Sequence, residues 1–455
     1  MLRLSLKELA GAVGGRLNRP EFGDIVISEI TTDSRKVPAG ALFVPIKGEF
    51  FDGHDFLDTA YANGAACALS HNEQDESRPI IFVGDTTKAF LALGSWHIAQ
   101  IRPKTIAITG SNGKTTTKDL VASVMAQRFR THKTSGNLNN HVGLPLTLLD
   151  MPADTEVAVL EMGMNHLNEI SPLSRAAEPD IAIITNIGVA HIENLGSREG
   201  ILQAKLEILE GLKSGGLALF NGDDDFLPGV RSEHMTQYFG LGGHNSYRGV
   251  DIVKRGVRGV SFTVVSGDTR FDVEVPVPGT HMVYNALAAA AVGLTMGLAP
   301  GEIRAGIASF IPSGLRLNIS QSPRGITIID DAYNSNPDSA AAALEVLSEA
   351  EGRKICVLGD MLELGEDAPS MHFETGKQAA NAGIDLIMCV GALSWHTYMG
   401  ANEIAGPKRA VYFSDKESVK HALEGSLRPG DTLLIKASRG AAFEDITEWI
   451  KTLGD

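Results

Sequence analysis

The sequence predicts an α/β protein of three domains, with a central domain on a largely parallel sheet and a C-terminal, Rossmann-like domain that is doubly wound. Short apolar strand patterns alternate with helical patterns along most of the 455 residues, which is typical of strand–helix–strand units. Arg102-Pro103 and residues 311–314 (Ile-Pro-Ser-Gly) interrupt both patterns, and proline with glycine marks a boundary. We therefore expect domains at residues 1–102, 103–314 and 315–455, in line with a length prior of roughly three domains.

The first domain alternates short strands and helices, and the middle domain begins with three buried strands. Residues 105–108 form a short apolar run, and residues 157–160 and 181–185 repeat the pattern. Such runs are typical of parallel strands that are covered on both faces. Residues 286–294 are alanine-rich and apolar all round, but they fall short of the ~20 residues that span a bilayer. We expect a buried helix there.

The C-terminal domain repeats the alternation on a smaller scale. Strands are predicted at residues 326–329, 354–358, 386–390 and 432–435, with helical stretches between them. This order indicates a doubly wound sheet. No Gly-x-Gly-x-x-Gly turn opens the domain, so a nicotinamide-dependent dehydrogenase is disfavoured.

Composition excludes some classes of partner. A net charge of −15 disfavours nucleic acid, because neutralising phosphates requires clustered lysine and arginine. Cys67, Cys356 and Cys389 lie far apart among apolar residues, so we expect neither a cysteine metal site nor a disulfide framework. Residues 1–8 lack the apolar core of a signal peptide. We expect a cytoplasmic monomer that is not embedded in a membrane.

The turn at residues 109–116 (Thr-Gly-Ser-Asn-Gly-Lys-Thr-Thr) carries the strongest functional signal. It joins a predicted strand to a helix, and its backbone N–H groups and the helix dipole suit a polyphosphate. Lys114 is placed to reach the outer phosphates, and the hydroxyl of Thr115 or Thr116 to join a Mg²⁺ shell. Ile108 stands where the standard motif has its first glycine, and the alternative is an ordinary glycine-rich turn. We predict a site for ATP or GTP.

Polar residues follow the next two strands of the middle domain. Glu161 ends one strand, and Asn186 and His191 follow the other. Because the carboxyl ends of parallel strands meet at one edge, a carboxylate and an imidazole there would complete the shell of one or two Mg²⁺ ions. Taken alone, His191 is better interpreted as a hydrogen-bonded loop residue. Lys205 is most simply a solvated helix lysine, although carbamylation would make its amine a carboxylate-like ligand.

Four more segments offer candidate residues. The polar loop at residues 133–145 is either an irregular asparagine-rich turn or a substrate-facing loop, and the residues favour neither. His281 and Asn285 lie four apart on one face of a predicted helix start, where they would bracket a purine or a ribose. Asp331, directly after a strand, would hold a ribose or a metal, or else cap the next helix. Arg316 would bring a cation to the γ-phosphate when the domains close.

Several motifs together resemble one enzyme family. The turn at 109–116 resembles the ATP loop of the Mur ligases, the amide-forming enzymes of peptidoglycan precursor synthesis, which depart from the standard motif in the same manner. The segment Asp33-Ser34-Arg35, with Asp52-Gly53-His54, is similar to the uridine-nucleotide domain of that family. Three further segments resemble the branch of the family that adds D-alanyl-D-alanine: residues 136–145, 331–337 and 358–365. The resemblance extends over essentially the whole chain in the expected order.

The resemblance implies a role for each matching residue. Catalysis would depend on Lys114, Lys205, His191 and Arg316. ATP would be bound by Gly110, Ser111, Asn112, Gly113, Lys114, Thr115, Thr116, His281, Asn285, Arg316 and Asp331. Mg²⁺, as two ions, would be held by Thr115, Glu161, His191 and a carbamylated Lys205. Substrate would be bound by Ser34 and Arg35 at its UDP part, and by Asn137, Asn139, Asn140, Asn334 and Asn336. Residues 436–440 (Lys-Ala-Ser-Arg-Gly) depart slightly from the Lys-Gly-Ser-Arg pattern of the family.

The reaction that the resemblance implies is ATP-driven amide synthesis. An acid–D-amino-acid ligase of this kind would join D-Ala-D-Ala to UDP-MurNAc-tripeptide (UDP-N-acetylmuramoyl-tripeptide) through an acyl phosphate, giving the pentapeptide precursor of peptidoglycan. A related amide ligase that adds a free amino acid or a glutamate is the nearer alternative, and the segments at 136–145 and 331–337 argue against it. A module that hydrolyses ATP without forming a bond is the more distant one.

Overall fold

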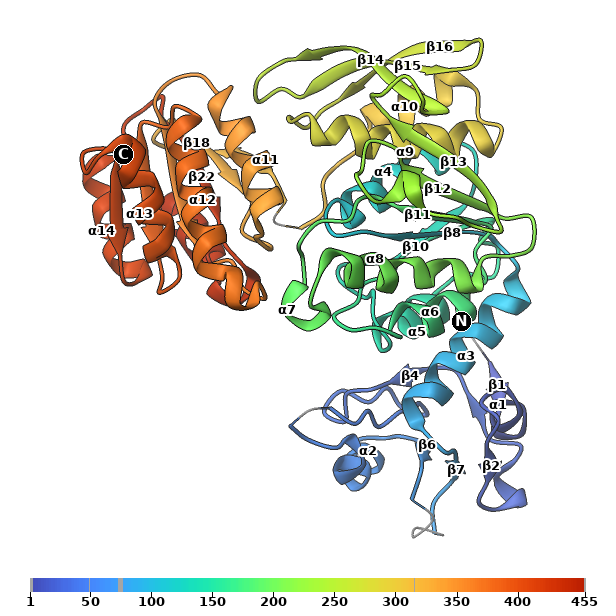
Figure 1. The fold of residues 1–455 in the computed structure, drawn as a ribbon. Helices are drawn as coiled ribbons and strands as arrows, with labels where there is room; N and C mark the ends of the chain where they lie inside the picture. Colours follow the sequence, from blue (N-terminus) through green and yellow to red (C-terminus); the bar gives the residue numbers. More distant parts are fainter. Residues whose placement is uncertain (1–2, 49, 73–76, 315, 454–455) are drawn as a thin grey trace.

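The computed structural model describes residues 3–48, 50–72, 77–314 and 316–453. Three main sheets follow one another along the chain, and Figure 1 shows them in three bodies, with the middle one between the other two. The α/β class and the parallel sheets expected from the sequence are confirmed. The expected junction at Leu315 and the N-terminal Met1-Leu2 lie outside the described residues. The domain bounds 1–102, 103–314 and 315–455 therefore stay a prediction.

The N-terminal body is small and built from short strands. Its elements are β1 (Leu4–Ser5), α1 (Leu6–Ala12), β2 (Arg16–Leu17), β3 (Val26–Ile27), β4 (Ile30–Thr31), β5 (Leu42–Phe43), α2 (Leu57–Ala62), β6 (Cys67–Ser70), β7 (Ile80–Phe82) and α3 (Thr86–Ile101). Strands β2-β7-β6-β5-β4 form the sheet in that order, and β1 pairs with β3 separately. Helix α3 begins at the Asp85 cap and leads from this body to the next (Figure 1).

The middle body is the largest. Its elements are β8 (Lys104–Thr109), α4 (Lys114–Met125), β9 (Thr131–Lys133), α5 (Gly143–Leu149), β10 (Val157–Glu161), α6 (Ile170–Ala177), β11 (Ile181–Ile184), α7 (Ile192–Leu195), α8 (Arg198–Leu206), β12 (Leu217–Asn221), β13 (Met235–Gly240), β14 (Tyr247–Lys254), β15 (Val260–Ser266), β16 (Thr269–Val275), α9 (His281–Thr295) and α10 (Pro300–Ala308). Its nine strands have the order β16-β15-β14-β13-β12-β11-β8-β10-β9.

Side chains of the central strand β8 pack toward opposite faces of this sheet. Ile106 and Ile108 join the core beneath α4 and α9, whereas Ala107 joins the core beneath α5, α6 and α8. Because both faces of the sheet are covered, successive residues of the strand are apolar. The predicted strands are found as β8, β10 and β11, and the predicted buried helix is α9. These parallel strands bring the turn after β8, Glu161 and the residues after β11 to one edge.

Strands β14, β15 and β16 form an antiparallel extension of the parallel sheet. Alternate residues of β16, Phe271, Val273 and Val275, are buried, and those between them are exposed. This alternation is typical of a strand with one solvated face. The sequence prediction did not include the extension.

The C-terminal body is a doubly wound sheet. Its elements are β17 (Asn318–Gln321), β18 (Thr327–Asp330), α11 (Pro337–Ser348), β19 (Lys354–Gly359), α12 (Ala368–Asn381), β20 (Leu386–Val390), α13 (Ser394–Ala405), β21 (Ala410–Phe413), α14 (Lys416–Ser426), β22 (Thr432–Lys436) and α15 (Glu444–Thr452). The strand order is β17-β18-β22-β19-β20-β21, parallel except for the edge strand β17. Strands β18, β19, β20 and β22 match the four predicted positions. Within the described ranges, no helix is both long enough and apolar enough to cross a bilayer.

Candidate active site

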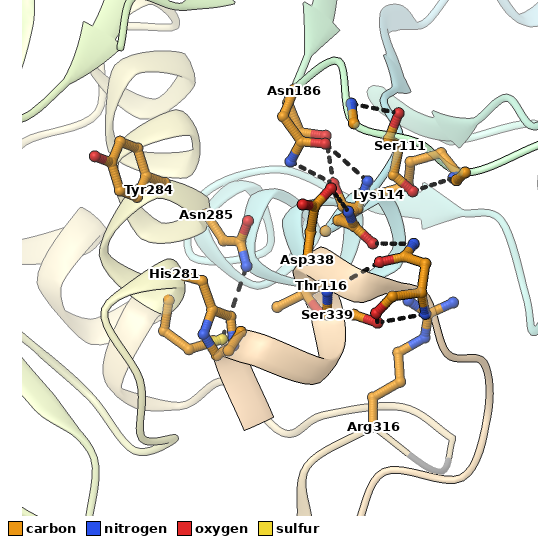
Figure 2. Close-up of a pocket in the computed structure, with 18 of the residues that line it drawn as sticks. Ser111, Lys114, Thr116, Asn186, His281, Tyr284, Asn285, Arg316, Asp338 and Ser339 are labelled. Atoms are coloured by element: carbon orange, nitrogen blue, oxygen red, sulfur yellow. Dashed lines mark hydrogen bonds between the residues drawn. The ribbon is translucent and has the colours of Figure 1, made fainter. Parts of the chain in front are cut away.

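A cavity of about 630 Å³ lies between the middle and C-terminal bodies. Figure 2 shows that helix α9, the turn before α4 and the start of α11 all contribute side chains to it. Twelve of the predicted site residues line it: Ser111, Asn112, Gly113, Lys114, Thr116, His191, His281, Asn285, Arg316, Asp331, Asn334 and Asn336. Residues from three separate predicted groups are thus brought together by the fold.

The turn between β8 and α4 is held open by two glycines with positive φ. Gly110 has φ +150, and a Cβ there would lie 1.8 Å from Thr185 Oγ1. Gly113 has φ +80 and a Cβ would lie 2.7 Å from Asn285 Oδ1. Among the described residues, no side chain caps the start of α4, so N–H groups of its first turn are available to an anion.

Lys114 occupies the centre of this turn. Its amine donates to the carbonyl oxygens of Gly110 at 2.8 Å and Ser111 at 3.3 Å. Burial lowers the pKa of Lys114 to about 8; the nearby Glu161 carboxylate opposes this shift and the Arg316 cation adds to it. A cation with its charge poorly compensated by protein groups is suited to a phosphate.

Glu161 and Lys205 lie deeper and do not line the cavity. Glu161 is buried; its Oε1 accepts from Asn139 Nδ2 at 2.8 Å, while its Oε2 has no hydrogen-bond partner among the described residues. Lys118 Nζ is 4.0 Å from that oxygen. The Lys205 amine, equally buried, makes no hydrogen bond or ion pair within the described ranges. Burial, with a smaller contribution from Lys114, lowers the pKa of Lys205 well below its usual value.

His191 joins the middle body to the C-terminal one. It has a left-handed backbone, with φ +65, directly before α7. Its Nδ1 lies 2.6 Å from an Oε2 oxygen of Glu363, and this pair lowers the pKa of the Glu363 carboxyl. Glu363 is also left-handed, with φ +63. The predicted metal ligand thus has a carboxylate partner that the sequence prediction did not assign to it.

Helix α9 supplies the wall of the cavity that lies beside the phosphate turn. Asn285 accepts a hydrogen bond from the Thr117 hydroxyl at 3.2 Å, which ties α9 to α4. His281 is one turn earlier; burial lowers its pKa, and its Nδ1 lacks a partner among the described residues. Tyr284, also labelled in Figure 2, lines the same wall.

The C-terminal body contributes α11, whose first residues face the phosphate turn. Asn336 Nδ2 donates to Asn112 Oδ1 at 2.9 Å, and Asn112 Nδ2 donates to Asp338 Oδ2 at 3.4 Å. Asn336 also caps α11 by accepting from Ser339 N. The cap that the sequence allowed for Asp331 is therefore supplied by Asn336. The Asp331 carboxylate instead accepts from Lys436 Nζ at 2.5 Å.

Arg316 reaches the cavity from the connection between the two bodies. Its guanidinium lies 4.4 Å from the centre of the Tyr333 ring, and that of Arg439 lies 5.1 Å from the same ring. The ring holds both cations by cation–π contact. Asn334 is the neighbour of Tyr333, and it also lines the cavity.

The remaining predicted residues lie outside this cavity lining. Thr115 and Gly110 belong to the phosphate turn, and Asn140 accepts from the N–H groups of Val142 and Gly143 within its own loop. Ser34 and Arg35 belong to the N-terminal body, where the Arg35 side chain is 83% exposed and donates to Asp33. Asn137 is exposed in the loop that leads to Asn139.

Some lining residues were not predicted as site residues. Asp338, Asn221, Lys436 and the acidic run Asp223-Asp224-Asp225 all face the cavity. Asp338 follows the Asn-Pro pair that starts α11, and that cap signal would have placed it at a helix N-terminus. Lys436 ends a predicted strand, and the topology rule for carboxyl ends would have found it.

Comparison with known proteins agrees with this architecture. Family models match in three places: "Mur ligase family, catalytic domain" at residues 26–89, "Mur ligase middle domain" at 108–293, and "Mur ligase, glutamate ligase domain" at 315–439. The UDP-N-acetylmuramoyl-tripeptide–D-alanyl-D-alanine ligase of Bacillus subtilis is 41% identical over 98% of both chains. The ligase of the same name from Escherichia coli is 36% identical over 100% of both.

Solved structures give the same result. MurF from Acinetobacter baumannii superposes with a TM-score of 0.93 at 31% identity, covering 100% of both chains. The MurF ligase from Thermotoga maritima, solved in complex with ADP, has a TM-score of 0.83 at 29% identity, covering 93% of this chain and 97% of that one. The chain therefore belongs to the Mur ligase family and, within it, to the MurF branch.

Proposed function

We propose that this chain joins D-Ala-D-Ala to UDP-MurNAc-tripeptide with conversion of ATP to ADP and phosphate, giving UDP-MurNAc-pentapeptide. One observation carries the proposal: the start of α4, with Lys114, and the start of α11 face one cavity between two bodies. Two helix N-termini and a lysine suit a polyphosphate. The relatives from Bacillus subtilis and Escherichia coli, which bear the name of this reaction, are matched over almost their whole length.

The chemistry requires positioning more than a protein nucleophile. A carboxylate is a poor electrophile, so its oxygen first attacks the γ-phosphorus of ATP, and ADP leaves. The D-Ala-D-Ala amine then attacks the acyl phosphate carbon and loses a proton, and phosphate departs as the amide forms. Lys114, Arg316 and the N–H groups of α4 would neutralise charge on the transferred phosphoryl group. Enclosure between the bodies would exclude water, which otherwise hydrolyses the acyl phosphate.

We assign the two ends of ATP to two neighbouring walls of the cavity. Gly110, Ser111, Asn112, Gly113, Thr115 and Thr116 would bind the phosphates with Lys114. His281 and Asn285 would face the base, because they line the wall formed by α9. Asp331, held by Lys436, would accept from the ribose.

We assign substrate to the loops that surround the phosphate end. Ser34 and Arg35 would bind the UDP part, which the exposure of Arg35 permits. Asn139 links the asparagine loop to Glu161, so Asn137 and Asn140 would lie where the reacting carboxylate arrives. From the C-terminal body, Asn334 and Asn336 would contact the bound substrates.

The donor set near the phosphate turn fits Mg²⁺. Glu161 Oε2 is a buried carboxylate oxygen without a hydrogen-bond partner in the described ranges, and Thr115 adds a hydroxyl. These are hard oxygen donors, which Mg²⁺ prefers. We propose that Thr115, Glu161, His191 and a carbamylated Lys205 hold two Mg²⁺ ions. When bound, the ions would offset phosphate charge.

Lys205 meets the requirement for carbamylation. Burial lowers the pKa of its amine, which favours the neutral form that attacks carbon dioxide and then loses a proton. Protein equilibrated with ¹³C-bicarbonate should show a carbamate signal by NMR that disappears in Lys205→Ala. Short carboxylates should partly restore activity to that variant. A Lys205→Ala protein that keeps the signal would assign the carbamate elsewhere.

We further propose a cytoplasmic monomer with domain bounds at 102/103 and 314/315. Every proposed site residue comes from one copy of the chain, so no second copy is needed to complete the site. ATP and nucleotide-linked precursors are cytoplasmic compounds. Light scattering after size-exclusion chromatography would test the monomer.

The deciding experiment measures phosphate release with ATP, Mg²⁺, UDP-MurNAc-tripeptide and D-Ala-D-Ala, omitting each in turn. We expect release only with all four, and a nucleotide product heavier by the dipeptide in mass spectrometry. Release that a free amino acid supports as well as the dipeptide would indicate a neighbouring ligase. Release that needs neither substrate would indicate an ATPase without ligation.

A further inference from the structure

Asp119 is a buried carboxylate that the proposed chemistry does not use. It lies on α4, five residues after Lys114, and is 3% exposed. Its Oδ1 accepts from Lys133 Nζ at 2.7 Å and lies 3.3 Å from Lys118 Nζ. Its Oδ2 accepts from the Ser313 hydroxyl. The three partners come from three different parts of the chain.

Ser313 lies in the connection between the middle and C-terminal bodies. This connection runs from the end of α10, at Ala308, to the start of β17, at Asn318. Gly314, directly after Ser313, has φ +72, a conformation that favours glycine. Arg316, which lines the cavity, follows two residues later. Ser313, which is hydrogen-bonded to α4, therefore lies directly before a glycine whose backbone can adopt conformations that other residues rarely adopt.

Lys133 connects the same carboxylate to the asparagine loop. It is the last residue of β9, and the loop to α5 begins after it. Asn139 of that loop donates to Glu161. The Asp119 carboxylate, on the phosphate-turn helix, thus contacts both the strand that leads into the asparagine loop and the connection that leads to Arg316.

The energetics favour a persistent contact. A buried carboxylate is costly unless it is paired and hydrogen-bonded, and here two ammonium groups and a hydroxyl share its two oxygens. Hydrogen bonds to a charged acceptor are stronger than those between neutral groups. The hydrogen bond from Ser313 to Asp119 is therefore expected to hold Ser313 on α4 more strongly than a bond to a neutral, solvent-exposed acceptor would.

We propose that Asp119 is a positioning residue that anchors the interdomain connection to the phosphate-turn helix through Ser313. The C-terminal body then pivots at Gly314, and Arg316 arrives at the nucleotide from a fixed starting point. The inference rests on the proposed roles of Lys114 and Arg316. It goes beyond them by assigning the pivot and the residue that fixes it.

The test compares Ser313→Ala with Ser123→Ala. Ser123 is four residues after Asp119 on the same helix, and its hydroxyl also crosses to the α10 segment, donating to Gly306 O at 2.7 Å. Ser313→Ala should lower kcat by about tenfold, since misplacement of a catalytic group is costly, while the affinity for a fluorescent ATP analogue stays within about twofold of wild type. Dyes on the middle and C-terminal bodies should report a broader distance distribution. Ser123→Ala should match wild type in all three measurements.

Asp119→Asn adds a conservative variant. Its single side-chain oxygen cannot accept from both Lys133 and Ser313, because the amide N–H2 would face one of them. We therefore expect a loss of kcat and a broadening of the distance distribution at least as large as in Ser313→Ala. Equal behaviour of Ser313→Ala and Ser123→Ala would overturn the inference. A wild-type protein that binds nucleotide without ligation would instead refute the proposed function, and the distance measurement would still decide the pivot.

Discussion

Lysine side chains are unusually buried around the phosphate turn. Lys118 and Lys205 are each 1% exposed, and Lys118 lies 4.0 Å from Glu161. The charge on Lys114 contributes to the lowered pKa of Lys205, and burial lowers the pKa of Lys114 itself. Buried ammonium groups that repel one another cost free energy in the unliganded protein. A polyanion recovers that cost on binding, so we interpret the arrangement as one prepared for ATP.

Lys114→Ala is expected to lower kcat at least about 100-fold, the scale for removing one group that stabilises a developing charge. The melting temperature should change little, because the amine makes only two hydrogen bonds to its own turn. Steady-state phosphate release and calorimetry would measure both. Lys213→Ala is the control, since Lys213 forms an exposed pair with Asp180 away from the cavity lining. A near-normal rate in Lys114→Ala would remove the phosphate turn from the mechanism.

His372 makes a pH-dependent contribution to stability in the C-terminal body. Its Nε2 accepts from Met361 N at 2.9 Å, and its Nδ1 donates to Ala368 O at 2.7 Å, so the buried ring is neutral. Burial lowers its pKa, an effect to which His396 adds and which Asp360 opposes. Between this lowered pKa and about 6.5, the unfolded state binds more protons, so stability is present above that window and is lost as pH falls through it.

His372→Leu should therefore make the melting temperature less sensitive to acid. We expect the wild type to lose about 2–4 °C more than the variant between pH 7 and pH 5, the shift that about 1 kcal/mol produces in a domain of this size. Scanning calorimetry at the two pH values measures the difference. Parallel loss in both proteins would assign the acid sensitivity to other groups.

The phosphate turn as an element depends on close approach between β8 and β11. Gly110→Ala should lower the stability of the protein by about 3 kcal/mol and weaken nucleotide binding, because its Cβ would lie 1.8 Å from Thr185 Oγ1. That hydroxyl donates to Asn112 O at 2.5 Å, so the substitution would also disturb the turn. Gly215→Ala is the matched control: φ is +77 there as well, but no described atom lies within 4 Å. Chemical denaturation and titration with an ATP analogue would separate the two variants.

Elements whose signal is local were predictable from sequence. The strands β8, β10 and β11 and the turn after β8 were predicted, because a buried apolar run or a glycine-rich turn can be recognised from a few consecutive residues. The extension β14–β16 was missed, although Phe271, Val273 and Val275 alternate with polar residues in a pattern that is typical of a strand. Contacts such as Lys133 to Asp119 and His191 to Glu363 carry no such pattern. They join residues distant in sequence, so only the folded chain shows them.

The position of Asp331 shows a different limit. The sequence allowed it to cap a helix or to hold a ligand, since both use a carboxylate at a strand end. The fold gives the cap to Asn336 and pairs Asp331 with Lys436, which lies on β22. Strand β22 is next to β18 in the sheet but about a hundred residues away in the chain. Local residue chemistry therefore leaves this choice open, and the strand order decides it.

At the scale of the whole molecule, the contacts between the C-terminal and middle bodies include three that lie apart from one another. Asn336 contacts Asn112 at the cavity, and His191 contacts Glu363 at one side. Farther out, α11 contacts strand β14 of the antiparallel extension through Lys254. This arrangement gives the extension a role that its position at the sheet edge does not suggest. It provides a surface that the C-terminal body contacts.

Lys254 is the residue on which this contact depends. Its Nζ lies 2.5 Å from Oε1 of Glu345, on α11, and 2.5 Å from Oε1 of Glu349, the residue directly after that helix. Glu345 also accepts from the Thr280 hydroxyl at 2.8 Å, next to the cavity residue His281. Lys254→Ala should therefore shift the protein toward an open arrangement by about fivefold, the ratio that corresponds to about 1 kcal/mol for a favourable exposed ion pair. Dyes on the two bodies, read at low ionic strength, would measure the shift.

Three comparisons make this last prediction decisive. Arg270 forms a more exposed pair with Asp251 at 2.6 Å, but both residues lie in the antiparallel extension, so Arg270→Ala should leave the distance distribution unchanged. Lys254→Ala and Glu345→Gln should be non-additive in a double-mutant cycle, because each removes the same contact. Raising salt from about 0.05 M to 0.5 M should move the wild type toward the variant, since screening weakens exposed pairs. If Arg270→Ala opens the molecule as much as Lys254→Ala does, the extension matters through its own fold, and closure against it is not set by this ion pair.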